Sequence, residues 1–275
     1  MKEAKALNVD ILGISETRLI DVGENKEDET YTFYNSGGEQ HEHGVGILIK
    51  KKFAKAILGV VCVSKRNILI KIKGAPLNLS ILQTYAPTSE YPEEELEQYY
   101  EEVAKTIKMV KSDEVLVVMG DLNAKVGNGK HEKIVGDYGL GNRNERGDRL
   151  INFCQEENLC ILNTYFQHPP RRTYTWKSPG DVSRNQIDYI MIRQRFRNSI
   201  KQCSTFPGAD INSDHNPVIA KMNFKLKKMP SPANNTPKVN VAKLSLPDTQ
   251  EQYSIKFQNR YEILFQELHV NQSVP

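Results

Sequence analysis

The stretch VLVVMGDLNAKVG, residues 115–127, decides how the rest of the chain is interpreted. Five apolar residues lead into Gly120, and Asp121 and Asn123 then stand two positions apart with Leu122 between them. Such an apolar run is typical of a strand covered by helices. Gly, Asp and Asn are also the residues that turns favour. The strand therefore either ends in an ordinary turn, or presents both polar side chains to one ligand from the same face.

Short strand-like runs recur on both sides of this stretch. They read VDILGI (9–14), GVGILI (44–49), ILIKIK (68–73), LNLSILQTY (77–85), LCILNT (159–164), IDYIMI (187–192) and PVIAKMNF (217–224). Two segments have helical periodicity instead, one from Pro92 to Val110 and one over 146–157. Because strands dominate and the two helices are far apart, we predict a strand-rich α/β sandwich.

Composition limits the class of protein. The 275 residues carry a formal net charge of +3 and have a mean hydropathy of −0.55. The apolar runs are far shorter than the roughly 20 residues of a membrane span, and MKEAKALNVD does not resemble a signal peptide. The four cysteines lack metal-binding spacing, so we expect reduced thiols in an intracellular protein without a membrane partner. These features leave the oligomeric state open.

The character of the sequence changes after residue 224. Residues 225–250 contain four prolines among Lys, Asn, Ser and Thr, which is typical of a flexible linker. The last segment regains a helical stripe, formed by Phe257, Tyr261, Leu264 and Leu268. We predict a main domain at 1–224, a linker at 225–250 and a helix within 251–275.

Four of the apolar runs adjoin compact polar groups. These read SETR (15–18), GDLN (120–123), NQIDY (185–189) and SDHN (213–216). Carboxylates at strand ends, with a histidine beside an aspartate, suit metal-assisted hydrolysis, because Mg²⁺ prefers oxygen ligands and a carboxylate or imidazole can activate water. Each group alone also fits a turn or a surface carboxylate. Their combination favours catalysis.

The motifs GISETRL, QTYAPT, GDLNAKVG, NQIDYI and SDHNPV, in this order, resemble those of the endonuclease/exonuclease/phosphatase superfamily. The resemblance implies a four-layered α/β sandwich, with two packed mixed β-sheets flanked by helices. NERGDRLINFCQEENLCILNT and TYTWKSPGD are most similar to non-LTR (LINE-type) retrotransposon endonuclease domains and to craniofacial development protein 2-like proteins. The segment VAKLSLPDTQEQYSIKFQNRYEILF resembles the connector that precedes reverse transcriptase in such polyproteins, although this sequence contains no reverse transcriptase.

This resemblance implies a Mg²⁺-dependent endonuclease that nicks DNA, with Mn²⁺ as an alternative ion and the nucleus as the expected location. Glu16 matches the principal metal ligand of the family. Asp214 matches a carboxylate near the metal and the leaving group, and Tyr85 matches a tyrosine that contacts the scissile phosphate.

Four further residues are assigned by the same resemblance. Asp121 matches the acid that orients or deprotonates the attacking water, and Asn123 matches its phosphate-binding partner. His215 matches the histidine that hydrogen-bonds the phosphate, and Asp188 the acid paired with it. The sequence leaves open whether Asp121 or His215 is the base.

The beginning of the sequence departs from the family pattern. Relatives carry a strand with an Asn ahead of the strand that holds the Glu, whereas MKEAKAL matches only the intervening helix. We therefore expect an N-terminally truncated sandwich with unpaired strand edges. Two alternatives to a DNA-nicking endonuclease remain, namely a catalytically inactive interaction module and a phosphatase acting on small phosphoesters.

DNA binding would require cationic contacts to phosphates. The candidate contacts lie in loops, at Arg66, Asn142, Arg143, Asn144, Arg146, Arg171, Arg172 and Lys177. Tyr174 and Trp176 could stack on bases or belong to the core.

Overall fold

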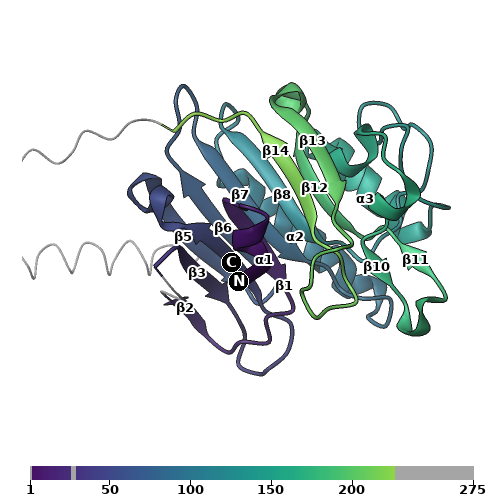
Figure 1. Ribbon diagram of the computed structural model, residues 1–275, viewed down its shortest axis with the longest axis horizontal. Coiled ribbons are helices and arrows are strands. Elements are labelled where there is room, and N and C mark those ends of the chain that lie inside the picture. Colours follow the sequence, from purple (N-terminus) through teal and green to yellow (C-terminus); the bar gives the residue numbers. More distant parts are fainter. Residues whose placement is uncertain (1, 26–28, 227–275) are drawn as a thin grey trace, which may run out of the picture. The chain divides into compact units, whose positions relative to one another are not determined.

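The computed structural model describes residues 2–25 and 29–226 (Figure 1). The predicted helix within 251–275 and nearly all of the predicted linker lie outside these residues. The described part has three α-helices, α1 (Lys2–Ala6), α2 (Glu93–Lys108) and α3 (Glu145–Glu156). Five short 3₁₀ helices are η1 (Lys51–Ala56), η2 (Leu162–Tyr165), η3 (Pro170–Arg172), η4 (Pro179–Asp181) and η5 (Gln194–Ser199).

The larger sheet has six strands in the order β5-β6-β7-β8-β12-β9. Their bounds are β5 (Ile57–Ser64), β6 (Asn67–Ile72), β7 (Leu79–Tyr85), β8 (Val115–Asp121), β12 (Asp188–Arg193) and β9 (Leu159–Ile161). The pair β7 and β8 is parallel and is connected through α2, whereas the other four pairs are antiparallel. This sheet is therefore mixed, as predicted.

The remaining strands of the described residues form three separate antiparallel units, and the two longer ones pack against the six-stranded sheet as the second β-layer. Four strands follow the order β1-β4-β3-β2, with β1 (Ile11–Ser15), β4 (Val45–Lys50), β3 (Tyr31–Ser36) and β2 (Val22–Asn25). A two-stranded ladder joins β13 (Ile200–Thr205) to β14 (Val218–Met222), and a short one joins β10 (Trp176–Lys177) to β11 (Arg184–Asn185). The expectation of a second mixed sheet was wrong, because every strand pair in these units is antiparallel. The expected truncation stays a prediction.

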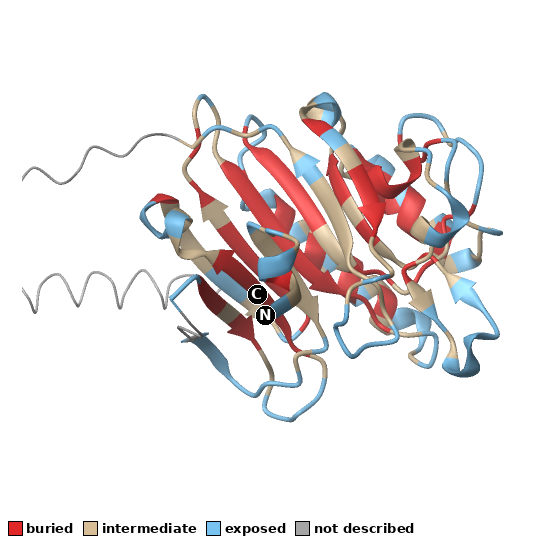
Figure 2. Cartoon of the chain, viewed as in Figure 1, coloured by how far each residue is buried: buried red, intermediate tan, exposed pale blue. Residues whose placement is uncertain are grey.

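The strand β8 lies at the centre of two cores, which explains why VLVVM is apolar at every position. Leu116 and Val118 pack against α2 and α3, while Val115 and Val117 pack against the second β-layer. Both faces of the strand are thus covered, and burying each such side chain contributes roughly 1.5–3 kcal/mol. Figure 2 shows these buried strands running through the middle of the domain.

A fourth layer is provided by α1. Its Ala4 packs on the four-stranded sheet against Tyr31, Phe33 and Leu48. The Tyr31 hydroxyl donates to the carbonyl oxygens of Ala4 and Val9, at 3.1 and 2.7 Å, and so anchors this helix. The order helix, sheet, sheet, helices gives the predicted four-layered sandwich. No helix in the described residues is long and apolar enough to cross a membrane.

Candidate active site

Three neighbouring strands align a tyrosine and two aspartates at one edge of the six-stranded sheet. The parallel pairing of β7 with β8 places Tyr85 beside Asp121. The antiparallel pairing of β8 with β12 places Asp188 on the other side of Asp121. Three residues far apart in the sequence therefore form one row across the sheet.

Asp121 is buried at the centre of this row, with 4% of its surface exposed. Gly120 has a φ of +153°, and a Cβ there would lie 1.8 Å from the Thr84 carbonyl oxygen, so only glycine fits ahead of Asp121. Burial and then the negative charge of Asp188 raise the pKa of Asp121 to about 8, although His215 partly opposes this. A carboxylate tuned near neutral pH is suited to proton transfer.

Asn123 lies beyond the end of β8, in a left-handed turn. Its φ is +47°, its backbone N–H donates to Asp121 Oδ1 at 3.0 Å, and its side-chain amide donates to the Ala86 carbonyl oxygen at 3.0 Å. The turn and the polar site are therefore compatible. The position of Asn123 is therefore not set by the alternation of a strand. The turn instead directs both its backbone N–H and its side-chain amide toward the Asp121 carboxylate.

Asp188 and His215 form a hydrogen-bonded pair, with 2.9 Å between Asp188 Oδ2 and His215 Nδ1. Burial lowers the pKa of His215, but the hydrogen bond and the charge of Asp188 outweigh it and raise that pKa to about 9. The imidazole is therefore protonated at neutral pH, with Nδ1–H donating to the carboxylate.

Two buried polar residues that sequence reasoning missed hold the backbone of Asp188. The Thr175 hydroxyl accepts from the N–H of Asp188 at 3.1 Å, and Asn163 Nδ2 donates to the carbonyl oxygen of Asp188 at 2.9 Å. Asn163 is the polar residue that follows the apolar run LCIL, and Thr175 precedes Trp176. For Asn163, its position directly after a buried apolar run was the sequence feature that could have marked it as a site residue.

Glu16 meets Tyr85 across the two β-layers. The Tyr85 hydroxyl donates to Glu16 Oε1 at 2.7 Å, while the Glu16 side chain keeps 43% of its surface exposed. Burial, then the hydrogen bond to Glu16, raise the pKa of Tyr85 well above its usual range, so Tyr85 remains a neutral donor. Glu16 itself has a φ of +53° at the end of β1.

Asp214 lies at the margin of the site and has an aromatic partner. The Trp176 indole N–H donates to Asp214 Oδ2 at 2.8 Å, and the backbones of Trp176 and His215 form an isolated bridge. The negative charge of Asp214 contributes to the raised pKa of His215. Trp176 thereby holds the Asp214–His215 turn against the sheet edge.

The residues that could hold a metal ion are more numerous than the expected pair Glu16 and Asp214. One ligand atom from each of Asp121, Asp188 and His215 lies within 4.8 Å of the other two. The Nδ1 atom of His215 is engaged by Asp188, so the available donors of this cluster are mainly carboxylate oxygens. Such an oxygen-rich set, with Glu16 beside Tyr85, fits a hard divalent cation such as Mg²⁺.

Several of the expected DNA contacts have structural roles instead. Arg146 donates to the carbonyl oxygens of Pro87 and Tyr91 at 2.7 and 3.2 Å, and Arg143 Nε donates to the Val126 carbonyl oxygen at 2.9 Å. Asn144 caps α3 by accepting from the N–H of Gly147. The hydrogen bonds of these side chains are thus made to backbone groups of the protein itself.

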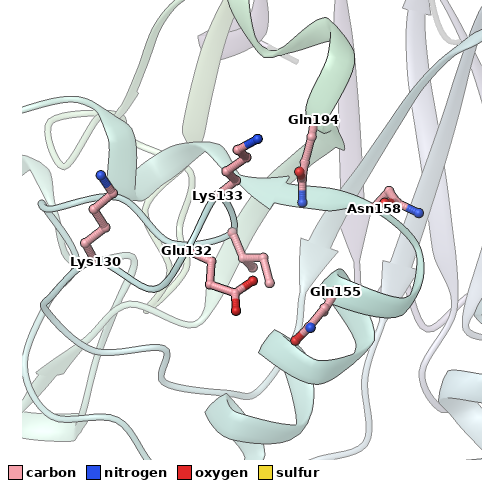
Figure 3. A pocket seen from close by; sticks show the side chains of 7 residues that line it. Lys130, Glu132, Lys133, Gln155, Asn158 and Gln194 are labelled. Carbon is pink, nitrogen blue, oxygen red and sulfur yellow. The ribbon is translucent and has the colours of Figure 1, made fainter.

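A cavity of about 600 Å³ lies elsewhere (Figure 3). It is lined by Lys130, Glu132, Lys133, Ile134, Gln155, Asn158 and Gln194. Because Gln194 follows the end of β12 whereas Asp188 begins that strand, this cavity is at the end of the strand away from the candidate site.

Comparisons with known proteins show which family the chain belongs to. The model of the endonuclease/exonuclease/phosphatase family matches residues 1–215. Two curated relatives named craniofacial development protein 2, from Bos taurus and Tragulus javanicus, are each 42% identical over 229 residues. The alignments cover 83% of this chain but 39% and 40% of those proteins, so the chain spans less than half of their length.

Solved structures share the fold at low sequence identity. The endonuclease domain of TRAS1, a telomere-specific non-LTR retrotransposon, has a TM-score of 0.57 and 16% identity, over 81% of this chain and 90% of its own. The Xenopus laevis APE2 catalytic domain has a TM-score of 0.63 and 16% identity, over 83% and 88%. The Neisseria 3′ phosphatase NExo, bound to a product DNA hairpin, has a TM-score of 0.57 and 16% identity, over 80% and 93%.

Proposed function

Because the chain belongs to the endonuclease/exonuclease/phosphatase family, we propose that it is a Mg²⁺-dependent phosphodiesterase that nicks DNA, of retrotransposon origin and acting in the nucleus. The observation that carries this proposal is the row of Tyr85, Asp121 and Asp188 across three strands, with His215 bound to the last of them. DNA as the substrate is supported by the structural neighbours, one of which is bound to a product DNA hairpin.

In this proposal Asp121 is the base, and Asn123 fixes its orientation. Burial lowers the pKa of His215, but its hydrogen bond to Asp188 and the charge of that carboxylate raise it to about 9. His215 is therefore protonated at neutral pH and stabilises negative charge on the phosphate through Nε2–H, while Asp188 holds the ring by Nδ1. Asp121 in its ionised form accepts the proton of the attacking water.

Tyr85 and Glu16 form the second hydrogen-bonded pair of the proposed site. The Tyr85 hydroxyl, a neutral donor, sets the orientation of Glu16 through their 2.7 Å hydrogen bond. With Asp121 serving as the base, Glu16, Asp188 and Asp214 are the carboxylates left to hold a Mg²⁺ ion, which would offset the charge that develops on the phosphate oxygens. The chemistry of these carboxylates, and their hydrogen bonds to Tyr85, His215 and Trp176, support these roles.

The test is nicking of supercoiled plasmid in the presence of Mg²⁺, with EDTA as the metal-free condition. We expect Asp121→Asn and His215→Gln each to lower the rate by about 100-fold or more. Asp113→Asn and His131→Gln are matched controls; Asp113 precedes β8, at the end of that strand opposite Asp121. They should retain the wild-type rate.

Two results would refute the proposal, namely no metal-dependent nicking by the wild type, or equal nicking by the site variants. A parallel assay with soluble inositol phosphates tests the phosphatase alternative. Hydrolysis of these small phosphoesters without plasmid nicking would replace DNA as the proposed substrate.

A further inference from the structure

Arg66 is a buried cation next to Tyr85. It lies between β5 and β6, with 7% of its surface exposed. Its guanidinium Nη1 donates to the Tyr85 carbonyl oxygen at 3.3 Å, and Nη2 donates to Glu95 Oε1 on α2 at 2.9 Å. The same group stands 5.5 Å from the ring centre of Tyr85 and 5.3 Å from that of Tyr91. One side chain thus contacts both the backbone and the ring of Tyr85.

The turn formed by Lys65 and Arg66, between β5 and β6, connects Tyr85 with the residues after Glu16. The N–H of Tyr85 donates to the Arg66 carbonyl oxygen at 2.9 Å, and the N–H of Gly44 donates to the Lys65 carbonyl oxygen at 3.0 Å. In turn, Gly44 accepts from the N–H of Thr17 at 3.1 Å. The turn is therefore bonded on one side to Tyr85 and, through Gly44, on the other side to the segment that follows Glu16.

On this basis, and resting on the function proposed above, we propose that Arg66 is a positioning residue that holds the Tyr85 hydroxyl against Glu16. The planar guanidinium can bond Glu95 and the Tyr85 carbonyl oxygen at once while lying near two rings, whereas a lysine ammonium offers neither the fork nor the flat face. Its burial and its pairing with Glu95 argue against a contact with DNA phosphates, the role expected from the sequence.

The chain contains a matched control for this chemistry. Arg149 binds Glu97, also on α2, through Nε at 2.6 Å and Nη2 at 2.8 Å, and lies 4.4 Å from the ring centre of Tyr100. Arg149→Lys therefore alters an equivalent arginine, glutamate and tyrosine cluster, in which Arg149 has no hydrogen bond to a site residue among the described residues.

The experiment compares Arg66→Lys with Arg149→Lys in plasmid nicking at varied DNA concentration. We expect Arg66→Lys to lower kcat by about 10- to 100-fold, since small misplacements at a reacting centre have such effects. KM for DNA should stay within about two-fold, and Arg149→Lys should leave both constants near wild type. Equal kinetics for the two variants, or a rise in KM alone for Arg66→Lys, would overturn the proposal.

A double-mutant cycle with Tyr85→Phe then tests whether Arg66 acts through the hydroxyl. The double variant Arg66→Lys/Tyr85→Phe should have about the same kcat as the slower of the two single variants, because both changes remove the same interaction. If the kcat loss of the double variant equals the product of the two single losses, the two residues act independently and the proposal is overturned. Glu95→Gln, which weakens the anchor of Arg66 without removing it, should reproduce the kcat loss in milder form if Arg66→Lys does not fold.

A structural readout separates failure of this inference from failure of the proposed function. In tyrosine-labelled protein, the NMR signal of the Tyr85 ring, assigned by its loss in Tyr85→Phe, should shift in Arg66→Lys and not in Arg149→Lys. That result would stand even if the wild type does not nick DNA. An unshifted Tyr85 signal in Arg66→Lys would overturn the positioning role whatever the activity.

Discussion

Asp121 and Asp188 stand directly opposite each other on the antiparallel strands β8 and β12. Two carboxylates so placed cannot both ionise freely, because like charges disfavour one another and burial adds to the cost. His215, bonded to Asp188, supplies the compensating positive charge. The site is therefore an electrostatically linked group, and its protonation is expected to affect stability as well as catalysis.

The first prediction concerns pH and stability in the absence of metal. The folded-state pKa values of Asp121, about 8, and His215, about 9, both lie above their unfolded values of 3.8 and 6.5. Groups with raised folded pKa values stabilise the fold when protonated, so this contribution falls from about pH 4 to 8 for Asp121 and from about pH 6.5 to 9 for His215. Thermal melting with EDTA should show Tm decreasing between pH 6 and pH 9.

Asp121→Asn is the informative variant for this slope. It removes one raised carboxyl and also one of the negative charges that raise the pKa of His215. The decrease of Tm between pH 6 and pH 9 should therefore be smaller than in the wild type. If Asp121→Asn keeps the full decrease of Tm, the pH dependence of stability does not originate in the Asp121, Asp188 and His215 group.

The second prediction concerns the Asp188–His215 pair. Asp188→Asn removes the negative charge that holds the imidazole protonated, so the pKa of His215 should fall toward its usual range. We expect a loss of about 10²-fold in kcat at neutral pH and an alkaline limb of the pH–rate profile shifted to lower pH. Asp181→Asn, at an exposed ion pair with Arg184, should leave the profile unchanged; an unshifted profile in Asp188→Asn would contradict the pairing role.

The third prediction concerns Gly44, which bonds to the segment that follows Glu16. Gly44 has a φ of +80°, and a Cβ there would lie 2.4 Å from Thr17 Oγ1. Gly44→Ala should lower the free energy of unfolding by about 1–3 kcal/mol through backbone strain, with a further cost from the contact with Thr17. Gly129→Ala provides the comparison, since its φ is +106° but a Cβ there meets nothing within 4 Å. Urea denaturation should rank Gly44→Ala as the more damaging, and equal losses would exclude a contribution from Thr17.

The fourth prediction concerns two buried tyrosine hydroxyls. The Tyr189 hydroxyl lies 2.5 Å from the Gln186 carbonyl oxygen and accepts from the N–H of Val126 at 3.2 Å. Tyr189→Phe leaves these backbone groups without a partner and should cost about 1–3 kcal/mol. The Tyr100 hydroxyl is buried without a hydrogen-bond partner among the described residues, so Tyr100→Phe should be neutral or stabilising. Urea denaturation of both variants checks the contrast, and equal costs would contradict it.

Much of the fold followed from periodicity. The predicted helix from Pro92 to Val110 corresponds to α2, and the segment 146–157 corresponds to α3 within one residue at each end. VLVVM and IDYIMI became the adjacent strands β8 and β12. These elements were predictable because their apolar residues are spaced for the face or faces they bury.

The separate units of the second β-layer could not be predicted in the same way. Strand order depends on which edges meet in space, and no local pattern in β1 specifies that β4 lies beside it. The left-handed turn at Asn123 was likewise obscured by the alternation of Asp121 and Asn123, since a turn and a strand can share that pattern.

The candidate residues were identifiable by type and order, but their partners were not. Asp188 beside His215 was expected from the resemblance, whereas the burial of Arg66 against Tyr85 reversed the surface role that its charge suggested. A charged residue in a loop is usually solvated, and its sequence neighbours do not reveal that α2 supplies a glutamate to meet it.

The two-stranded ladder β13–β14 has a further consequence. His215 lies in the connection between these strands, whereas its partner Asp188 begins a strand of the six-stranded sheet. The two halves of this pair thus belong to separately hydrogen-bonded units, which can open with different free energies. If the ladder detached locally, His215 would lose its hydrogen bond to Asp188 while the rest of the domain stayed folded. On heating, activity is therefore expected to be lost at a lower temperature than the Tm of the sandwich.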